Sequence, residues 1–286
     1  MRAVALFLFF ALCAPVVVAR AQDAPQWRSL DVSRQLRDSA PQRIKVQYGA
    51  GRVDVRSTDA PLLYGMHLRY DELRAVPLHR YDAEQHSAVL GLESRNATAR
   101  VASGGRTQSG EHRLLLPRAV PLDLDLEFGG AEAMLELGGL SLQSVRLECG
   151  ATDATLGFTT PNRAHMRELN VDVGAASFTA LHLGNANADQ IRVRGGMGAV
   201  DLDFSGSWQR DLTVLTRVGI GKTTLRVPDD VGVRLEIQRV AAGFDHEGMV
   251  KRADAWYSTN WDTATRKLRI RAETVFGALE LQRSTR

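Results

Sequence analysis

The sequence predicts an all-β protein, a single-domain parallel β-solenoid (β-helix) with coils of about 21–24 residues and capping strands at both ends. Between Pro121 and Pro228 one pattern recurs: an alternating apolar strand, a large or soft apolar residue, a glycine, and a second alternating strand. Successive glycines are 21, 24, 24 and 21 residues apart, in Phe128-Gly129, Cys149-Gly150, Val173-Gly174, Met197-Gly198 and Val218-Gly219. A fixed period in the twenties is typical of stacked repeats.

Each repeat alternates apolar and polar residues on both sides of its glycine. In the first repeat the apolar positions are Leu124, Leu126 and Phe128 before the glycine, then Ala133, Leu135 and Leu137 after it. Period two gives each strand one buried face. We therefore expect each glycine at a corner between two strands, where it can take positive φ or let another backbone approach closely. A β-sandwich is the alternative fold, because short strands at this spacing also fit one.

The same pattern returns near both ends of the chain. Ile44, Val46 and Tyr48 alternate before Gly49-Ala50-Gly51, which indicates one more coil or its cap. Beyond the repeats, residues 231–237 form the last clear strand, and Phe276-Gly277 repeats the corner motif. A solenoid needs covered ends because a bare end coil exposes an unpaired edge and the apolar core.

The domain organisation follows from these boundaries. The start of the chain has Arg2, an apolar run and Ala19-Arg20-Ala21, which together predict a cleaved signal peptide. The expected segments are a signal peptide (1–21), a polar linker (22–42), N-terminal strands and cap (43–111), solenoid repeats (112–228), and a C-terminal coil and cap (229–286). We expect an exported protein, periplasmic or extracellular. No transmembrane span is expected in the mature chain, because no later segment has the roughly 20 apolar residues that a span needs.

Charge and cysteine content argue against nucleic-acid binding and against an internal disulfide. Removing Arg2 and Arg20 lowers the basic count from 36 to 34, against 33 acidic residues, and aromatic residues make up 6% of the chain. A near-neutral, aromatic-poor protein is not expected to bind nucleic acid. Without the signal peptide only Cys149 remains, in an inward repeat position, so we expect a buried thiol and no internal disulfide.

Several segments carry a family resemblance. They are QRIKVQYGAGRVDVR, LLYGMHLRYDE and PLHRYD near the amino end, the corner glycines, and the ending YSTNWDTATRKLRIRAETVFGALEL. They resemble the bacterial toast-rack domain family, which is similar to the extracytoplasmic domains of cell-wall-active antibiotic response proteins and to β-solenoid adhesins. The resemblance covers about 42–282. It implies the solenoid fold, an envelope location and a binding or sensing role, with no catalytic residues.

Acidic residues are the main candidates for chemistry. Asp123, Asp125, Glu127, Asp201 and Asp203 have the side chains for calcium or for sugar hydrolysis, and they sustain the alternative of a polysaccharide-active β-helix enzyme. Because they alternate with leucines, we expect them on solvent-facing strand positions. Acidic residues stacked around Asp201 and Asp203 beside basic ones would favour the enzyme, and scattered charge would favour binding.

Two other motifs give weaker evidence of a functional site. Residues 219–224, GIGKTT, look like a phosphate-binding loop, but Thr216 stands where that motif needs its first glycine, so a repeat corner is expected. The seven histidines show no metal-ligand spacing, and no metal site or cofactor is expected.

The candidate binding surface is aromatic and lies near the carboxyl end. Trp256, Tyr257 and Trp261 suit a stacking platform for a sugar or peptidoglycan strand, or else a cover for the end of the apolar core. We expect a non-catalytic cell-envelope module whose partner is an envelope protein or polysaccharide. The alternatives are the enzyme and a self-assembling structural protein, a homo-oligomer joined at an uncapped end.

Overall fold

The computed structural model describes residues 24–95, 110–245 and 248–284. The expected signal peptide (1–21) lies outside these ranges, as does His246. Regular structure in the described part is almost entirely β; the short 3-10 helix η2 (Leu183–Ala186) is the exception there. Within the same ranges, no helix has both the length and the apolar character that crossing a bilayer requires.

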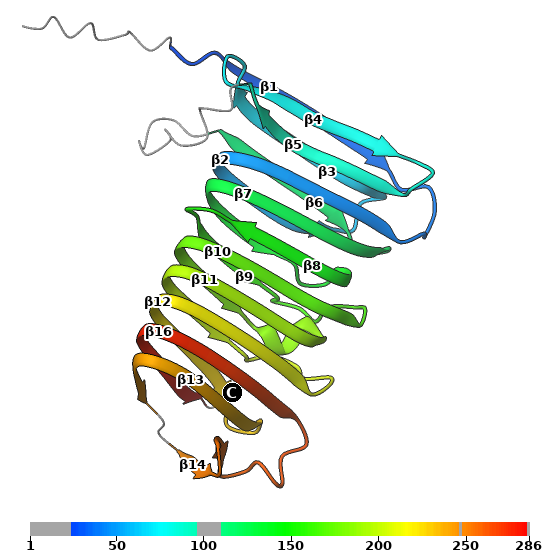
Figure 1. Cartoon of the computed structure of the whole chain (residues 1–286). Coiled ribbons are helices and arrows are strands. Elements are labelled where there is room, and N and C mark those ends of the chain that lie inside the picture. The colour runs from blue at the N-terminus through cyan, green and yellow to red at the C-terminus, as the bar shows by residue number, and fades with distance from the viewer. Residues whose placement is uncertain (1–23, 96–109, 246–247, 285–286) are drawn as a thin grey trace, which may run out of the picture.

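The body is a parallel β-solenoid, as the repeat predicts, and not a sandwich (Figure 1). Each layer pairs in parallel with the next, and the long strands bend near their middle so that two arms enclose the core. In spatial order the layers are β2 (Gln42–Thr58), β7 (Pro121–Glu136), β8 (Ser141–Cys149) with β9 (Asp153–Gly157), β10 (Met166–Leu181), β11 (Ala188–Asp203), β12 (Leu212–Pro228), β16 (Lys267–Ser284) and β13 (Gly232–Asp245).

The alternation places the core as expected. In β7 the buried residues are Leu122, Leu124, Leu126 and Phe128 on the first arm and Ala131, Ala133 and Leu135 on the second. The buried positions Phe128 and Ala131 are three residues apart, so the pattern shifts by one at the corner, and Gly129 and Gly130 are left outside it. The two arms thereby turn their apolar faces toward each other, and each buried leucine contributes about 2 kcal/mol of transfer free energy.

Stacked glycines form the corner. A Cβ built on Gly129, Gly150, Gly174, Gly196 or Gly219 would lie between 2.3 and 2.8 Å from the carbonyl oxygen of the glycine in the preceding layer. A side chain at these positions would push the layers apart. From β2 to β12 the corner can therefore be tight because each of these layers supplies a glycine here.

One predicted anchor is wrong. Val173 aligns with Gly195 and not with Met197, so the corner glycine of β11 is Gly196. Met197 aligns with Ile220, which in turn aligns with Phe276, and all three side chains are more than half exposed. The sequence does not identify the corner glycine of β11, because this strand carries glycines at 195, 196 and 198. Only the pairing between layers shows which of them lies at the corner.

The amino-terminal end is closed by strands on both arms. On the first arm of β2 lie β5 (Ser87–Ser94) and then β4 (Ala75–Asp82). On the second arm lie β6 (Glu111–Pro117), β3 (Leu62–Asp71) and β1 (Trp27–Gln35). β1 falls within the segment expected to be a polar linker; its Leu30 and Val32 pack against the core.

The carboxyl-terminal strand is not the last layer. β16 lies between β12 and β13, and its Phe276-Gly277 aligns with Ile220-Gly221 of β12. The outermost layer is β13, which the hairpin of β14 (Met249–Arg252) and β15 (Ala255–Ser258) covers in part. The chain therefore passes outward to β13, turns through the hairpin, and returns to fill the layer beneath (Figure 1).

Candidate functional site

The three aromatic residues expected to form a binding surface lie on β15 and the turn after it. Trp256 aligns with the buried Leu235, packs against the core and meets Phe244 edge to face at 5.5 Å. Tyr257 aligns with Arg234 on the outward face and meets Trp261 edge to face at 5.5 Å. Neighbouring strand residues point to opposite sides, so the structure brings Tyr257 and Trp261 together and uses Trp256 as part of the cover.

Main-chain hydrogen bonds hold Trp261 in place. Its backbone N–H donates to the carbonyl oxygen of Ser258 at 3.1 Å, and the Ser258 hydroxyl accepts from the buried N–H of Val233 at 2.8 Å. The Asn260 amide donates to the Asp229 carbonyl oxygen at 3.0 Å. The turn is thus tied to the outermost layer, and an aromatic pair on it is preorganised for contact.

Four cations surround this pair. Lys267 Nζ lies 5.2 Å and Arg269 Cζ 5.7 Å from the ring centre of Trp261. Arg252 and Arg234 lie 5.4 Å and 6.0 Å from the ring centre of Tyr257, and Arg234 Nε donates to the Tyr257 hydroxyl at 3.0 Å. We call these six residues the cap cluster: Arg234, Arg252, Tyr257, Trp261, Lys267 and Arg269. The cations were not predicted, although the basic residues at 251–252 and 266–271 flank the aromatic segment in the sequence.

The first group of candidate carboxylates is neutralised by neighbouring layers. Lys45 on β2 bridges Asp125 at 3.5 Å and also contacts Glu127, to which Gln47 donates at 2.6 Å. Burial opposes ionisation of Glu127, but the hydrogen bonds from Lys45 and Gln47 outweigh it and lower its pKa. Asp123 is engaged by Ser144 and, at 3.4 Å, by Arg167. These residues act as links between layers.

The second group does not stack. Asp201 aligns with Thr179 and Thr224 in the adjacent layers, and its ion-pair partner is Arg226 at 3.7 Å. Asp203 accepts from the hydroxyl of Ser205 at 2.8 Å, and that hydroxyl also meets His182 Nδ1 at 2.8 Å. The charge around Asp201 and Asp203 is scattered and is not a stack of acidic residues.

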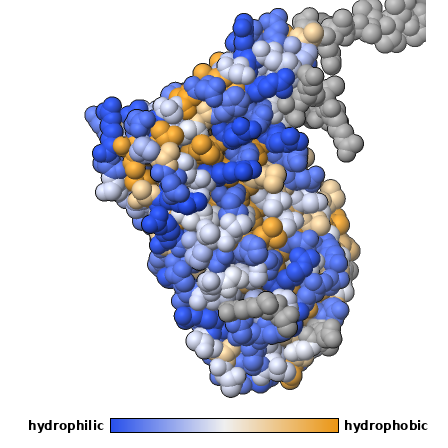
Figure 2. All heavy atoms as spheres, turned by 180° about the vertical axis from the view of Figure 1, so that it is seen from behind, coloured by the Kyte–Doolittle hydropathy of each residue, from blue (hydrophilic) through white to orange (hydrophobic). Residues whose placement is uncertain are grey.

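Charges of both signs are also mixed over the outward faces of the other layers. Ion pairs join successive layers, among them Arg194 with Asp172 at 3.0 Å and Arg217 with Glu273 at 2.6 Å. Figure 2 shows the result from behind: hydrophilic residues cover most of that face, with small hydrophobic groups between them. Such pairs fix the outer rows without creating a single-sign field.

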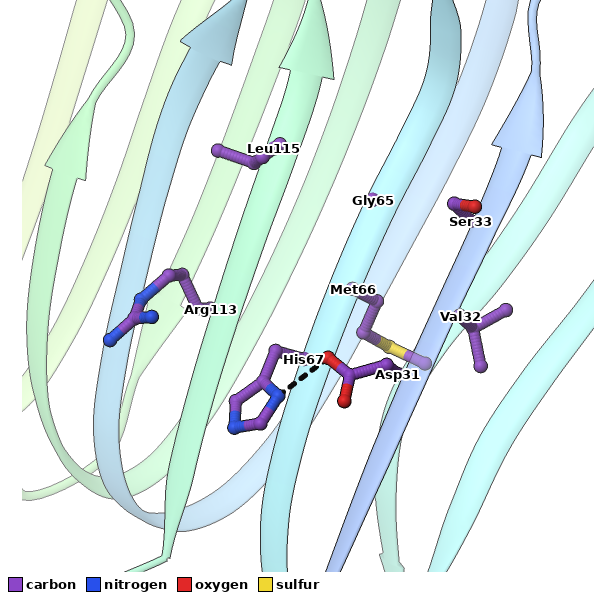
Figure 3. A pocket seen from close by; sticks show the side chains of 8 residues that line it. All are labelled: Asp31, Val32, Ser33, Gly65, Met66, His67, Arg113 and Leu115. Atoms are coloured by element: carbon purple, nitrogen blue, oxygen red, sulfur yellow. Dashed lines mark hydrogen bonds and ion pairs between the residues drawn. The ribbon is translucent and has the colours of Figure 1, made fainter.

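A shallow hollow of about 270 Å³ lies on the outer face of β1, β3 and β6 (Figure 3). Gly65, which has no side chain, leaves space beside Leu115, and His67 Nδ1 meets Asp31 Oδ1 at 2.7 Å on its rim. Its volume is below the range of ordinary small-molecule sites, and its polar rim is already paired.

The remaining motifs have structural places. GIGKTT lies inside β12 as the corner of a layer. Cys149 is 4% exposed, and burial raises the pKa of its thiol to about 12. Among the described residues, no three His, Cys, Asp or Glu side chains gather as a metal site would require.

Comparison with known proteins gives one family. The family described as "N-terminal domain of toast_rack, DUF2154" matches residues 28–179 and 162–226, well over half of the chain. Among curated proteins, none matches.

Several solved structures are also similar to the chain. A candidate cell-adhesion protein from Clostridium sporogenes is 16% identical over 91% of this chain and 100% of its own, with a TM-score of 0.49. Candidate adhesins from Bacteroides fragilis (8% identity, 90% and 98% covered, TM-score 0.41) and Parabacteroides distasonis (11% identity, 90% and 97% covered, TM-score 0.33) follow.

Proposed function

Since the chain belongs to the family of the N-terminal domain of toast_rack, we propose that it is an exported, non-catalytic binding module of the cell envelope, adhesin-like or sensing in role. It contacts its partner through the cap cluster at the outermost layer of the solenoid. The observation that carries the proposal is the edge-to-face pair of Tyr257 and Trp261 with four cations around it.

The solenoid supplies the frame for this contact. Its layers are held by parallel ladders and cross-layer ion pairs, so the cap cluster sits on a rigid element and needs little ordering when a partner binds. Aromatic residues give large contact area at low entropic cost. Non-catalytic action is supported by the candidate carboxylates, because Asp125, Glu127 and Asp201 are each tied to a basic side chain of another layer.

The test is capture of a cell-envelope fraction by the purified protein. The double variant Tyr257→Ser/Trp261→Leu is expected to lose capture while its circular dichroism stays native. The matched control Asp201→Asn/Asp203→Asn is expected to capture as the wild type does. Undiminished capture by the aromatic variant would refute the proposal. Release of sugar products that vanishes with the aspartate variant would favour the enzyme.

Self-assembly is a second candidate, and the end strands favour it. β1 and β4 stand at the two edges of the amino-terminal end, where, among the described strands, β1 pairs with β3 and β4 pairs with β5. Edge strands of this kind can pair with another chain. Light scattering during gel filtration at rising concentration measures it: a mass that grows with concentration supports assembly, and a constant monomer mass refutes it.

A further inference from the structure

Cations cover both outward rings of the cap cluster. Trp261 has Lys267 and Arg269 against it, and Tyr257 has Arg252 and Arg234. A neutral sugar binds an aromatic platform through a bare ring face, whereas here positive charge already occupies that space. The two rings therefore hold the cationic side chains in place through cation–π contacts. Because these side chains are already restrained, they lose little conformational entropy when a ligand binds.

The seated arginines keep donors for a ligand. Arg252 Nη1 donates to Asp262 Oδ2 at 2.9 Å, and Arg269 Nη1 donates to Asp211 Oδ2 at 3.2 Å. A guanidinium carries five N–H groups, and these two side chains are 48% and 43% exposed. Each arginine can thus keep its internal carboxylate and still bind a second anion from outside.

Lys267 adds a charge that no carboxylate among the described residues pairs with. Within the described residues its ammonium has no acidic oxygen at ion-pair distance, although its backbone N–H donates to Asp211 Oδ1 at 3.0 Å. Two further carboxylates lie near the arginines and not against Lys267: Glu236 pairs with Arg234 of the cap cluster and with Arg271, and Asp254 acts on the charge of Arg234. What the cap cluster offers to a partner is positive charge and N–H donors beside aromatic edges.

We propose that the ligand of the cap cluster is an acidic polysaccharide, a polymer whose sugar units carry carboxylates. This rests on the proposed role of the cap cluster as the contact surface. Carboxylates suit the arginine forks and the Lys267 ammonium, and the sugar units can contact the ring edges of Tyr257 and Trp261 that the cations leave uncovered. Nucleic acid is the weaker fit, since the whole chain has a formal net charge of only +3.

The test measures binding of soluble polymers to the immobilised full chain. The probes are polygalacturonate, neutral dextran of matched length, and inorganic polyphosphate, each at low and at high salt. Polygalacturonate is expected to bind at least about tenfold more tightly than dextran and to weaken as salt rises. Lys267→Met is expected to lose about fivefold or more in affinity and Lys267→Arg to retain it, because the charge is what matters. Lys222→Met, the same change on an inner layer, is the control and leaves affinity unchanged.

The outcomes separate the two proposals. Equal binding of dextran and polygalacturonate that still depends on Trp261 would overturn the acidic ligand and leave the binding surface standing. Polyphosphate binding as tightly as polygalacturonate would overturn the sugar and leave a general anion site. Polymer binding that is indifferent to both Lys267→Met and Trp261→Leu would overturn the surface itself. The lysine variants keep the test decisive even where the tryptophan variant fails to fold.

Discussion

Gly221 packs directly against the backbone of Gly198 in the next layer: a Cβ built on Gly221 would lie 1.7 Å from the Gly198 carbonyl oxygen. Gly277 repeats this relation with Gly221 at the same 1.7 Å. The φ angles of Gly221 and Gly277, +147° and +133°, also disfavour any other residue. Between β11, β12 and β16 this row is therefore a backbone contact that only glycine permits.

Replacing Gly221 tests this contact. Gly221→Ala is expected to lower the free energy of unfolding by about 3 kcal/mol or more, because it adds both a backbone clash and a strained φ. Urea unfolding followed by circular dichroism measures it. Gly49→Ala is the control: nothing lies within 4 Å of a Cβ there, so the change should stay within about 0.5 kcal/mol. Equal effects at the two sites would show that the close approach does not govern stability.

His112 predicts a pH dependence. Its ring is 0% exposed, neither nitrogen has a hydrogen-bond partner in the described structure, and Tyr48 lies 5.3 Å away. Burial lowers the pKa of His112 to about 4 from 6.5. The unfolded chain therefore binds a proton that the folded chain does not, and stability falls as pH drops from about 6.5 to about 4, by about 3 kcal/mol in all.

The variant His112→Leu isolates that contribution. Carboxylates also titrate in acid, so the quantity to measure is the difference in the free energy of unfolding between wild type and variant at pH 7 and at pH 4. Between pH 7 and pH 4, the free energy of unfolding of the wild type relative to His112→Leu should fall by about 3 kcal/mol. A pH-independent difference for His112→Leu would mean that the ring is solvated.

Cys149 should be chemically silent in the folded protein. Its thiol is buried, and its pKa is raised to about 12 by burial, so almost no thiolate exists at pH 8. Iodoacetamide is expected to alkylate Cys149 at least about a hundredfold faster in urea than in buffer. Mass spectrometry of the peptide containing Cys149 follows the reaction. Rapid labelling without denaturant would point to an accessible thiol and contradict the inward position.

The inserted layer gives a fourth prediction. A chain ending at residue 266 lacks β16, so β12 and β13 both lose a parallel partner and the core between them opens. We expect loss of cooperative unfolding and a tendency to aggregate. A chain beginning at residue 38 lacks only β1, which has one neighbour, β3, and should still unfold cooperatively. A fully cooperative 1–266 chain would contradict the strand order.

Local sequence patterns predict the individual layers of the solenoid but not the order in which the layers stack. The alternation of Leu122 to Leu126 and the glycine period depend on short-range geometry, so the two-armed coil could be read directly. The place of β16 between β12 and β13 is a choice among long-range pairings. A corner motif such as Phe276-Gly277 fits any neighbouring layer equally well, so the sequence places it in some layer without saying which.

The candidate site was predictable to a similar extent. The segment with Tyr257 and Trp261 stood out by composition, whereas the seating of Lys267 and Arg269 on Trp261 requires the turn that returns the chain to β16. The different place of Trp256 follows from strand alternation, once β15 is known to be a strand. Residues that come together across layers are the part that sequence leaves open.

We propose the cap cluster as the surface of the protein that binds polymer. Hydrogen–deuterium exchange of the full chain with and without polygalacturonate tests it most directly, because it locates the contact without any substitution. Binding at the cap cluster is expected to add protection in residues 255–269 and to leave exchange in β7 to β11 unchanged. Protection confined to the hollow on β1, β3 and β6, or binding without any protection in residues 255–269, would contradict it.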